Sequence, residues 1–523
     1  MAEQQPQTPV PEPGASWLQR ILRRFQGRRE HGDVIAANIE RSQGVAVGKN
    51  IIQIGTLAIP ALPLVLLIAL VAVGLGLLAW RAVSGPTTMP NGTFNIAIAT
   101  MADTDARGQP REAQRGRDIS ALIGRALVRD NEQSTYGSAN VAIWYDDLPR
   151  TQKATRLGIV AGANPEQRRR AAAALADAIG ADVLIYGTIA ADNLLIPEFY
   201  VKQQPRMEYD ANTGSYQLGD APINVDPSDK TALESAVTKR AGALFWLIKG
   251  LQFSSRGETE QAIAVWNDAA IDFDDWDGRD TLYFLKGQAA LFSAQRENDP
   301  EKFNSYVKQS TAAFDEAIRL NQNYARAYIG RGSVYKTLAD RMPPADRVRS
   351  PLIPQAIRDY QHARDLAPQA FDAPRAVGES AAALGSAYRL LGDTYLGLAN
   401  AAQAGGDSAG AAKLLGVAEQ HLDTAITDLR AALEPLGATE DRRLLGQAYL
   451  ALGNAASQKA IARGLLADSA GQKDWNMQAS SFYQSCIDQG RQLQSEDTIL
   501  LNDIIEQRCK PYKRVADQKV AGG

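Results

Sequence analysis

With 523 residues, the chain is too long for a single hydrophobic core, so three or more structural units are expected. The formal net charge of −3 gives no overall attraction to nucleic acid, and no nucleic-acid partner is expected. Charge is uneven along the chain, because basic residues outnumber acidic ones before residue 50. Residues 1–50 are therefore predicted to be a basic arm whose Pro- and Gln-rich beginning is disordered.

A long apolar run follows the basic arm. No charged residue occurs from Ile51 to Trp80, and a helix over residues 51–81 would be long enough to cross a bilayer. Because the basic residues precede this run, the positive-inside rule predicts a cytoplasmic N-terminus. The sequence therefore predicts a single-pass protein of the bacterial cytoplasmic membrane, with its C-terminal domains outside the cytoplasm.

The segment that joins the arm to the apolar run, residues 42–56, has three interpretations. It is a glycine-broken linker that leads into the membrane helix, a β-prone peptide that self-associates, or another contact site in the cytoplasm. Its residues Ile51 to Gly55, with the sequence IIQIG, resemble the short cores of amyloid-type signalling motifs. That resemblance implies self-association through residues 42–56.

Strand-like and helical stretches alternate after residue 90. This alternation predicts an α/β domain over residues 91–225, with a largely parallel sheet covered on both faces. Asn212 to Gly214 carry a turn signal between two β-prone runs, which predicts a hairpin. The expected elements are strands at 94–101, 139–147 and 181–190 and helices at 116–130 and 166–180.

The third predicted strand and the turn before it carry a family resemblance. With Gly180, Ala181, Asp182 and Gly187, this part of the chain resembles the small α/β domain of TolB N-terminal type. Similar domains precede helical repeats in some bacterial membrane-bound regulators. The resemblance implies a non-catalytic domain that contacts other proteins.

Residues 231–515 are rich in Ala and Leu, and their pattern repeats five times. In each copy a glycine on one helix is followed by bulky residues on the next. The pattern resembles the tetratricopeptide repeat (TPR), in which a small residue lets two antiparallel helices approach. Two departures are Lys or Arg before the first three signature glycines, and insertions predicted as loops between the paired helices. The signature glycines are Gly250, Gly287, Gly332, Gly392 and Gly453.

The TPR resemblance implies a protein-binding groove lined by the first helix of each pair. Polar side chains occupy the corresponding positions, although they fit a solvated surface equally well. These candidate groove residues are Arg326, Lys336, Arg389, Asp393 and Asn454.

The two cysteines, Cys486 and Cys509, lie near the C-terminus on successive predicted helices. In an oxidising compartment they would form a disulfide that holds a terminal capping helix to the last repeat. The alternative is two separate buried thiols. Their spacing fits no zinc site, and neither a metal nor a cofactor is expected.

The residues give little sign of catalysis. The chain has three histidines and lacks the phosphate-binding, metalloprotease and hydrolase motifs, so no enzyme is expected. Four carboxylates, Asp103, Asp105, Asp146 and Asp147, follow the first two predicted strands. If these strands are parallel neighbours, the carboxylates meet at one sheet edge and could bind a cation or a basic ligand. The alternative is ordinary turn and helix-capping aspartates.

Together these patterns predict a membrane-anchored scaffold that presents its repeats to an unidentified protein partner. Solenoids offer an extended surface rather than a catalytic pocket. The alternative is a sensor that binds a ligand in the α/β domain and signals through the membrane helix.

Overall fold

The computed structural model divides the chain into two compact units, Met1–Gly85 and Pro86–Gly523, and each is described by itself. The residues described are 45–48, 51–54, 57–60, 88–89, 94–105, 108–133, 141–146, 157–202, 214–217, 223–225, 230–272, 278–439, 441–492 and 501–522.

The described part of the first unit is a three-stranded antiparallel sheet made of β1 (Val45–Gly48), β2 (Ile51–Ile54) and β3 (Leu57–Pro60). The predicted helix over 51–81 is therefore wrong at Ile51–Pro60. Here Gln53 lies between Ile52 and Ile54, and Ala58 between Leu57 and Ile59, an alternation of large apolar with small or polar residues that suits strands. The rest of the predicted membrane helix, residues 61–81, lies outside the described residues. Within the described ranges, none of the helices combines the length and apolar character that a membrane crossing requires.

The second unit begins with a mixed sheet in the order β10-β9-β8-β4-β7. β4 is parallel to both of its neighbours, β7 and β8, whereas β9 is antiparallel to β8. β10 and β11 pair with β9, and β5 pairs with β8 and β6. The strands are β4 (Phe94–Ile98), β5 (Ala102–Thr104), β6 (Pro110–Arg111), β7 (Val141–Tyr145), β8 (Val183–Ile189), β9 (Leu194–Val201), β10 (Gly214–Gln217) and β11 (Ile223–Asn224).

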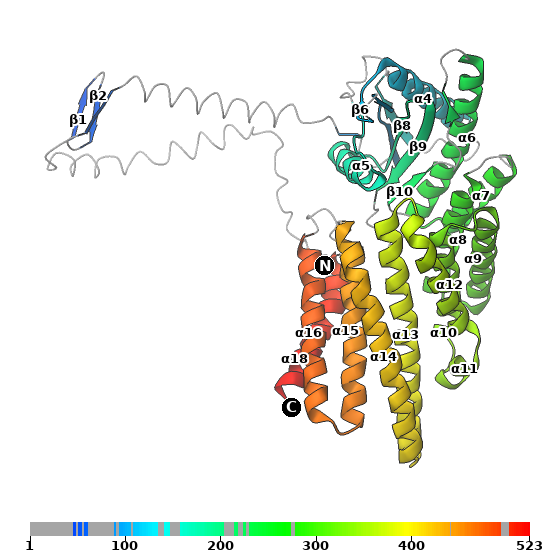
Figure 1. The fold of residues 1–523 in the computed structure, drawn as a ribbon, viewed down its shortest axis with the longest axis vertical. Helices are drawn as coiled ribbons and strands as arrows, with labels where there is room; N and C mark the ends of the chain where they lie inside the picture. Colours follow the sequence, from blue (N-terminus) through cyan, green and yellow to red (C-terminus); the bar gives the residue numbers. More distant parts are fainter. Residues whose placement is uncertain are drawn as a thin grey trace, which may run out of the picture. The chain divides into compact units, whose positions relative to one another are not determined.

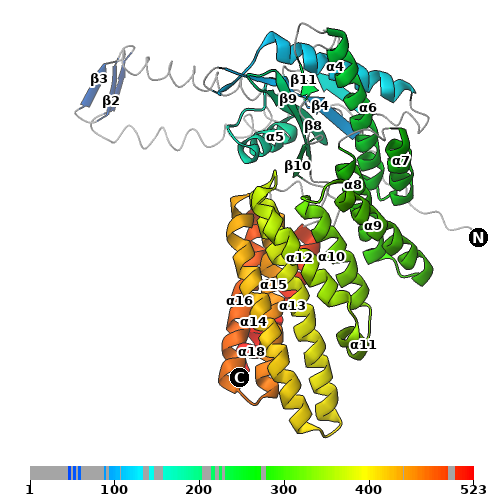
Figure 2. The ribbon, with the colours of Figure 1, turned by 45° about the vertical axis from the view of Figure 1, so that its right-hand side comes forward.

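Two helices cover opposite faces of this sheet (Figures 1 and 2), α4 (Gln114–Gln133) and α5 (Pro165–Ile179). Because β7 and β8 flank β4 on opposite sides, right-handed crossovers place the two connecting helices on opposite faces. Alternate residues of β4 supply the two cores, with Ile96 in the core under α4 and Ala97 in the core under α5. The predicted α/β region is thus present.

The antiparallel half of the sheet differs from the prediction. β9 was not predicted from the sequence, and Pro197 lies within its apolar run. Pro197 lies opposite Gly187 of β8, and on the other side of β9 it lies between the residues that pair with β10 and with β11. Gly214, predicted in a hairpin turn, is instead the first residue of β10 and lies opposite Val201.

The rest of the second unit is helical and is built from antiparallel pairs, which confirms the predicted helix pairing. Figure 1 shows the pairs following one another along the chain. The pairs are α6 (Lys230–Ser255) with α7 (Thr259–Asp272), α8 (Arg279–Arg296) with α9 (Pro300–Leu320), α10 (Ala325–Asp340) with α12 (Leu352–Leu366), α13 (Ala373–Ala404) with α14 (Ser408–Ala438), and α15 (Arg442–Leu465) with α16 (Ser469–Gln492).

All five signature glycines lie at helix crossings, as the repeat pattern predicts. At each of them an added Cβ would come within 2.1–2.8 Å of a bulky side chain on the second helix of the pair. The helices could not pack this closely around a larger residue. The contacts join Gly250 to Trp266, Gly287 to Phe314, Gly332 to Tyr360, Gly392 to Leu422, and Gly453 to Tyr483.

The longest pair is α13 with α14 (Figure 2), and it repeats this contact every seven residues. A Cβ added at Gly378, Gly385 or Gly392 would meet a leucine of α14 at 2.5–2.6 Å. The facing leucines run in the opposite direction, as antiparallel helices require: Leu436, Leu429 and Leu422.

The predicted insertion loops are wrong, because most of their residues lengthen the helices instead. Only residues 297–299 separate α8 from α9, 405–407 separate α13 from α14, and 466–468 separate α15 from α16. The inserted residues around 402 and 460 are Ala-rich, and alanine has the highest helix propensity. The remaining insertion, between α10 and α12, holds the short helix α11 (Pro344–Arg349).

The C-terminal cap begins with a π-helix, η3 (Leu501–Cys509), and continues as α18 (Lys510–Ala521), past the predicted end of the repeats at 515. A disulfide joins Cys486 of α16 to Cys509, with a Cα–Cα distance of 6.4 Å. The structure therefore has the bridge rather than two separate thiols.

Candidate functional site

The first helices of four successive pairs, α8, α10, α13 and α15, line a cavity of about 410 Å³. Four of the five candidate groove residues lie in its wall: Arg326, Lys336, Arg389 and Asn454. Asp393 does not line the cavity and instead accepts a hydrogen bond from Gln458 at 2.9 Å. The first-helix pattern thus brings together residues that are up to 128 positions apart in the chain.

The charged residues of the cavity wall are mainly basic. Arg326, Lys336, Arg389 and Arg508 line it, whereas Glu379 is the one acidic residue in the described wall. Arg508 comes from η3 and was not predicted from the sequence. Its neighbour Cys509 is the signal from which Arg508 could have been predicted, because the bridge to Cys486 holds this part of the chain against the last helix pair.

Lys336 and Arg389 project from neighbouring first helices. Burial and the positive charges of Arg389 and Arg347 lower the pKa of the Lys336 ammonium below its ordinary value, although the carboxylate of Asp340 opposes them. Neither side chain has a carboxylate at ion-pair distance among the residues that the structure describes. Two positive groups therefore share a cavity without a direct counter-ion.

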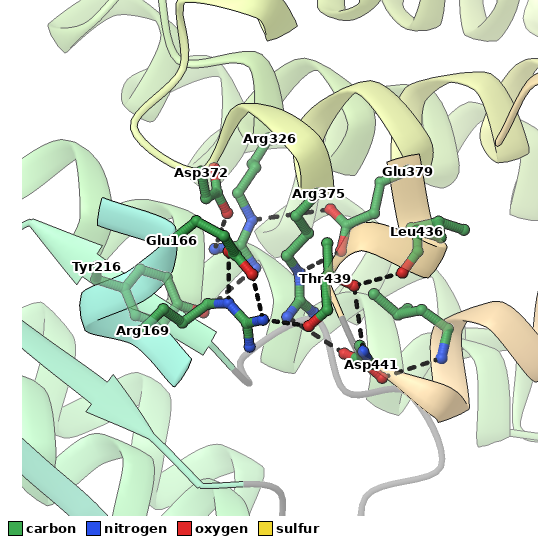
Figure 3. A network of polar contacts seen from close by, with 11 residues as sticks. Glu166, Arg169, Tyr216, Arg326, Asp372, Arg375, Glu379, Leu436, Thr439 and Asp441 are labelled. Carbon is green, nitrogen blue, oxygen red and sulfur yellow. Dashed lines mark hydrogen bonds and ion pairs between the residues drawn. The ribbon is translucent and has the colours of Figure 1, made fainter. Parts of the chain in front are cut away.

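Arg326, by contrast, is fully engaged in the fold (Figure 3). Its guanidinium lies over the rings of Tyr216 and Phe284, at 4.9 and 4.8 Å from their centroids. Asp372 and Glu379 lie 3.8 and 3.9 Å from its nitrogens. Burial alone would lower the pKa of Arg326, but Tyr216 and the two carboxylates raise it. Arg326 therefore joins β10 to the helices and is not available to a ligand.

The α/β domain contacts the end of α14 through two arginines of α5. Arg169 donates to the carbonyl oxygen of Thr439, while Glu166 accepts from Arg169 at 2.7 Å (Figure 3). Arg170 donates to the carbonyl oxygen of Ala438. These carbonyls belong to the C-terminal end of α14, where the helix dipole favours positive charge. We call this network the polar junction; it comprises Glu166, Arg169, Arg170, Tyr216, Arg326, Asp372, Arg375, Glu379 and Asp441.

The predicted ligand site of the α/β domain consists of engaged carboxylates. β4 and β7 are parallel neighbours, as expected, but Asp103 forms an ion pair with Arg115 at 2.9 Å. Asp146 accepts hydrogen bonds from Thr100 Oγ1 at 2.7 Å and from the Leu157 amide at 2.6 Å.

The remaining two carboxylates, Asp105 and Asp147, do not support a ligand site either. Asp105 accepts the amide hydrogen of Gln109 in a turn, at 2.9 Å, and Asp147 lies outside the described residues. No group of three or more His, Cys, Asp and Glu placed to hold a metal occurs in the described part of the chain. The aspartates that the structure describes thus have structural partners, the second of the two interpretations of the sequence.

Comparison with known proteins gives no family assignment. No family model matches the chain, and no curated protein matches it. Among solved structures, a thermophilic TPR protein of Thermus thermophilus is similar over 46% of this chain and 98% of its own, with 16% identity and a TM-score of 0.28. That similarity carries no argument about this chain, and the helix pairing is shown by the chain's own contacts.

Proposed function

We propose that this chain is a non-catalytic scaffold whose paired helices hold a protein partner. The observation that carries the proposal is the cavity shared by α8, α10, α13 and α15, where Lys336 and Arg389 have no carboxylate at ion-pair distance among the described residues. A solenoid presents such a surface along successive helix pairs. Basic side chains on this surface favour a partner segment that carries acidic groups.

Membrane anchoring belongs to the same proposal and rests on the sequence. Since β2 and β3 occupy Ile51–Pro60, the anchor we propose is Ala61–Trp80, an uncharged segment outside the described residues. As a helix it would span about 30 Å, the thickness of the hydrocarbon core. The basic arm before it would place the helical pairs outside the cytoplasm of a bacterial cell. Protease protection of the C-terminal units in spheroplasts would contradict this placement.

Two smaller parts of the proposal also rest on the sequence. The α/β domain would contact other proteins, as its resemblance to the TolB N-terminal type implies. Residues 42–56 would self-associate through their β-prone segments. A synthetic peptide of residues 38–56 that stays monomeric at high concentration would rule out this self-association. The alternative of a ligand sensor lacks such support, because Asp103 and Asp146 are already bonded within the domain.

The scaffold is tested by crosslinking in membranes, followed by capture of the full-length chain and identification of the crosslinked proteins. The variant Lys336→Glu/Arg389→Glu reverses the charge of the cavity wall. The matched control Lys413→Glu makes the same change at an exposed position of α14. We expect the double variant to lose a partner that the control and the unaltered chain retain. An identical set of partners in all three would contradict the proposal.

A further inference from the structure

Three basic side chains reach the same cavity from separate parts of the chain. Lys336 comes from α10, Arg389 from α13 and Arg508 from η3. The other charged residues of the wall, Arg326 and Glu379, lie 3.9 Å apart within the polar junction and offset each other. The cavity therefore has a net positive wall, made by Lys336, Arg389 and Arg508.

These three positive charges make the cavity energetically unfavourable when no ligand is bound. Like charges that share a cavity repel each other, and burial weakens the solvation of the Lys336 ammonium; its lowered pKa reflects both effects. No carboxylate among the described residues lies at ion-pair distance from any of the three cations. A bound anion would supply the missing negative charge.

The size and the other lining groups narrow the class of anion. A volume of about 410 Å³ is at the lower end of the range for small-ligand sites, so the ligand is compact. Around the cations, Thr337, Ser386 and Gln447 add hydroxyl and amide groups. Arginine can donate two parallel hydrogen bonds from its guanidinium, and lysine adds a compact positive charge. Together these groups can contact the several oxygens of a phosphate, whereas a carboxylate offers only two oxygens.

We propose that this cavity binds a compact, multiply charged anion of phosphate chemistry, held by Lys336, Arg389 and Arg508. The anion is either a free phosphate-bearing small molecule or a phosphate carried by the partner protein. Only the second source rests on the proposed scaffold function. In both cases Lys336 and Arg389 hold the anion, and Arg508 approaches from the disulfide-linked π-helix.

The test is calorimetric titration of the purified full-length chain at constant ionic strength. Inorganic pyrophosphate probes the free source. A short peptide with two adjacent phosphoserines, compared with its unphosphorylated form, probes the partner source. We expect at least one probe to bind, and Lys336→Met or Arg389→Met to weaken its binding by a factor of ten or more. Arg389→Lys should restore part of that loss, and the exposed control Lys413→Met should change nothing. Circular dichroism establishes that each variant is folded.

Several outcomes would overturn the proposal. They are the absence of binding by either probe, binding unchanged in both Met variants, or an equal loss in Lys413→Met. A failure of the scaffold proposal would give a different result. If probe binding needs Lys336 but partner capture does not, the anion site is supported and the scaffold function is refuted. The converse result would leave a scaffold without an anion site.

Discussion

The sharpest test of the fold concerns the contact between Gly392 of α13 and Leu422 of α14. A Cβ at position 392 would lie 2.6 Å from Leu422 Cγ, whereas the nearest backbone atom, Ala418 O, would be 3.4 Å away. Gly392→Ala should gain about 1 kcal/mol of helix propensity but lose about 2 kcal/mol to overpacking. The net expectation is a loss of about 1 kcal/mol.

The same contact makes a double variant informative. Leu422 is fully buried, so Leu422→Ala alone should cost about 3 kcal/mol. In Gly392→Ala/Leu422→Ala the new methyl group enters the vacated space, and the combined loss should be about 1–2 kcal/mol smaller than the sum of the single losses. At position 385 this rescue should fail, because a Cβ there would also lie 2.8 Å from the Ala425 carbonyl oxygen.

The measurement is urea unfolding followed by circular dichroism, with hydrogen exchange in α13 and α14 to localise the effect. Gly416→Ala is the matched control, because Gly416 lies on α14 with nothing near its absent Cβ. That control should stabilise the protein by about 0.5–1 kcal/mol. If Gly392→Ala stabilises it equally, the two helices do not pack as closely as described and the argument is refuted.

Three further predictions follow from single contacts. Lys336→Met should stabilise the free protein by about 1 kcal/mol at pH 7. Because the pKa of Lys336 is lower in the folded state, the stability of the unaltered chain rises as the pH approaches the ordinary lysine value of 10.5. The gain in melting temperature of the variant over the unaltered chain should therefore shrink at high pH. Arg169→Met should loosen the α/β domain from α14 by about 1–2 kcal/mol, seen as faster proteolysis, whereas exposed Arg129→Met should have no effect. Reducing the disulfide should remove up to about 3 kcal/mol from the cap, read as faster hydrogen exchange over 501–522, and unchanged exchange would contradict this.

The sequence predicted the helix crossings well because each depends on one small residue with no substitute. Gly250, Gly287 and the other signature glycines each face the bulky residue that the repeat pattern places opposite. The strands β4, β7 and β8 were also predictable, since short apolar runs between helices have few alternatives. Such local signals survive in a single sequence.

Other features depended on contacts that no local pattern records. Alanine-rich insertions were assigned to loops because repeat spacing, rather than helix propensity, guided the prediction. Arg326 was placed in the groove by its position on α10, but Tyr216, 110 residues earlier, recruits it to the polar junction. Arg508 reaches the cavity only because the chain returns through η3. In each case a partner distant in sequence decided the role of the residue.

The polar junction and the cavity share Arg326 and Glu379, so a ligand in the cavity would also act on the polar junction. Glu379 accepts a hydrogen bond from Arg375 at 2.7 Å and lies 3.9 Å from Arg326, which in turn contacts Tyr216 of β10. An anion beside Lys336 would repel Glu379 and attract Arg326, so it would act on the charges that hold the α/β domain. Since the charges of the junction lie in the wall of the anion cavity, any free energy by which the anion changes docking must equally change the affinity for the anion. The α/β domain is therefore better placed to respond to the cavity than to a ligand of its own.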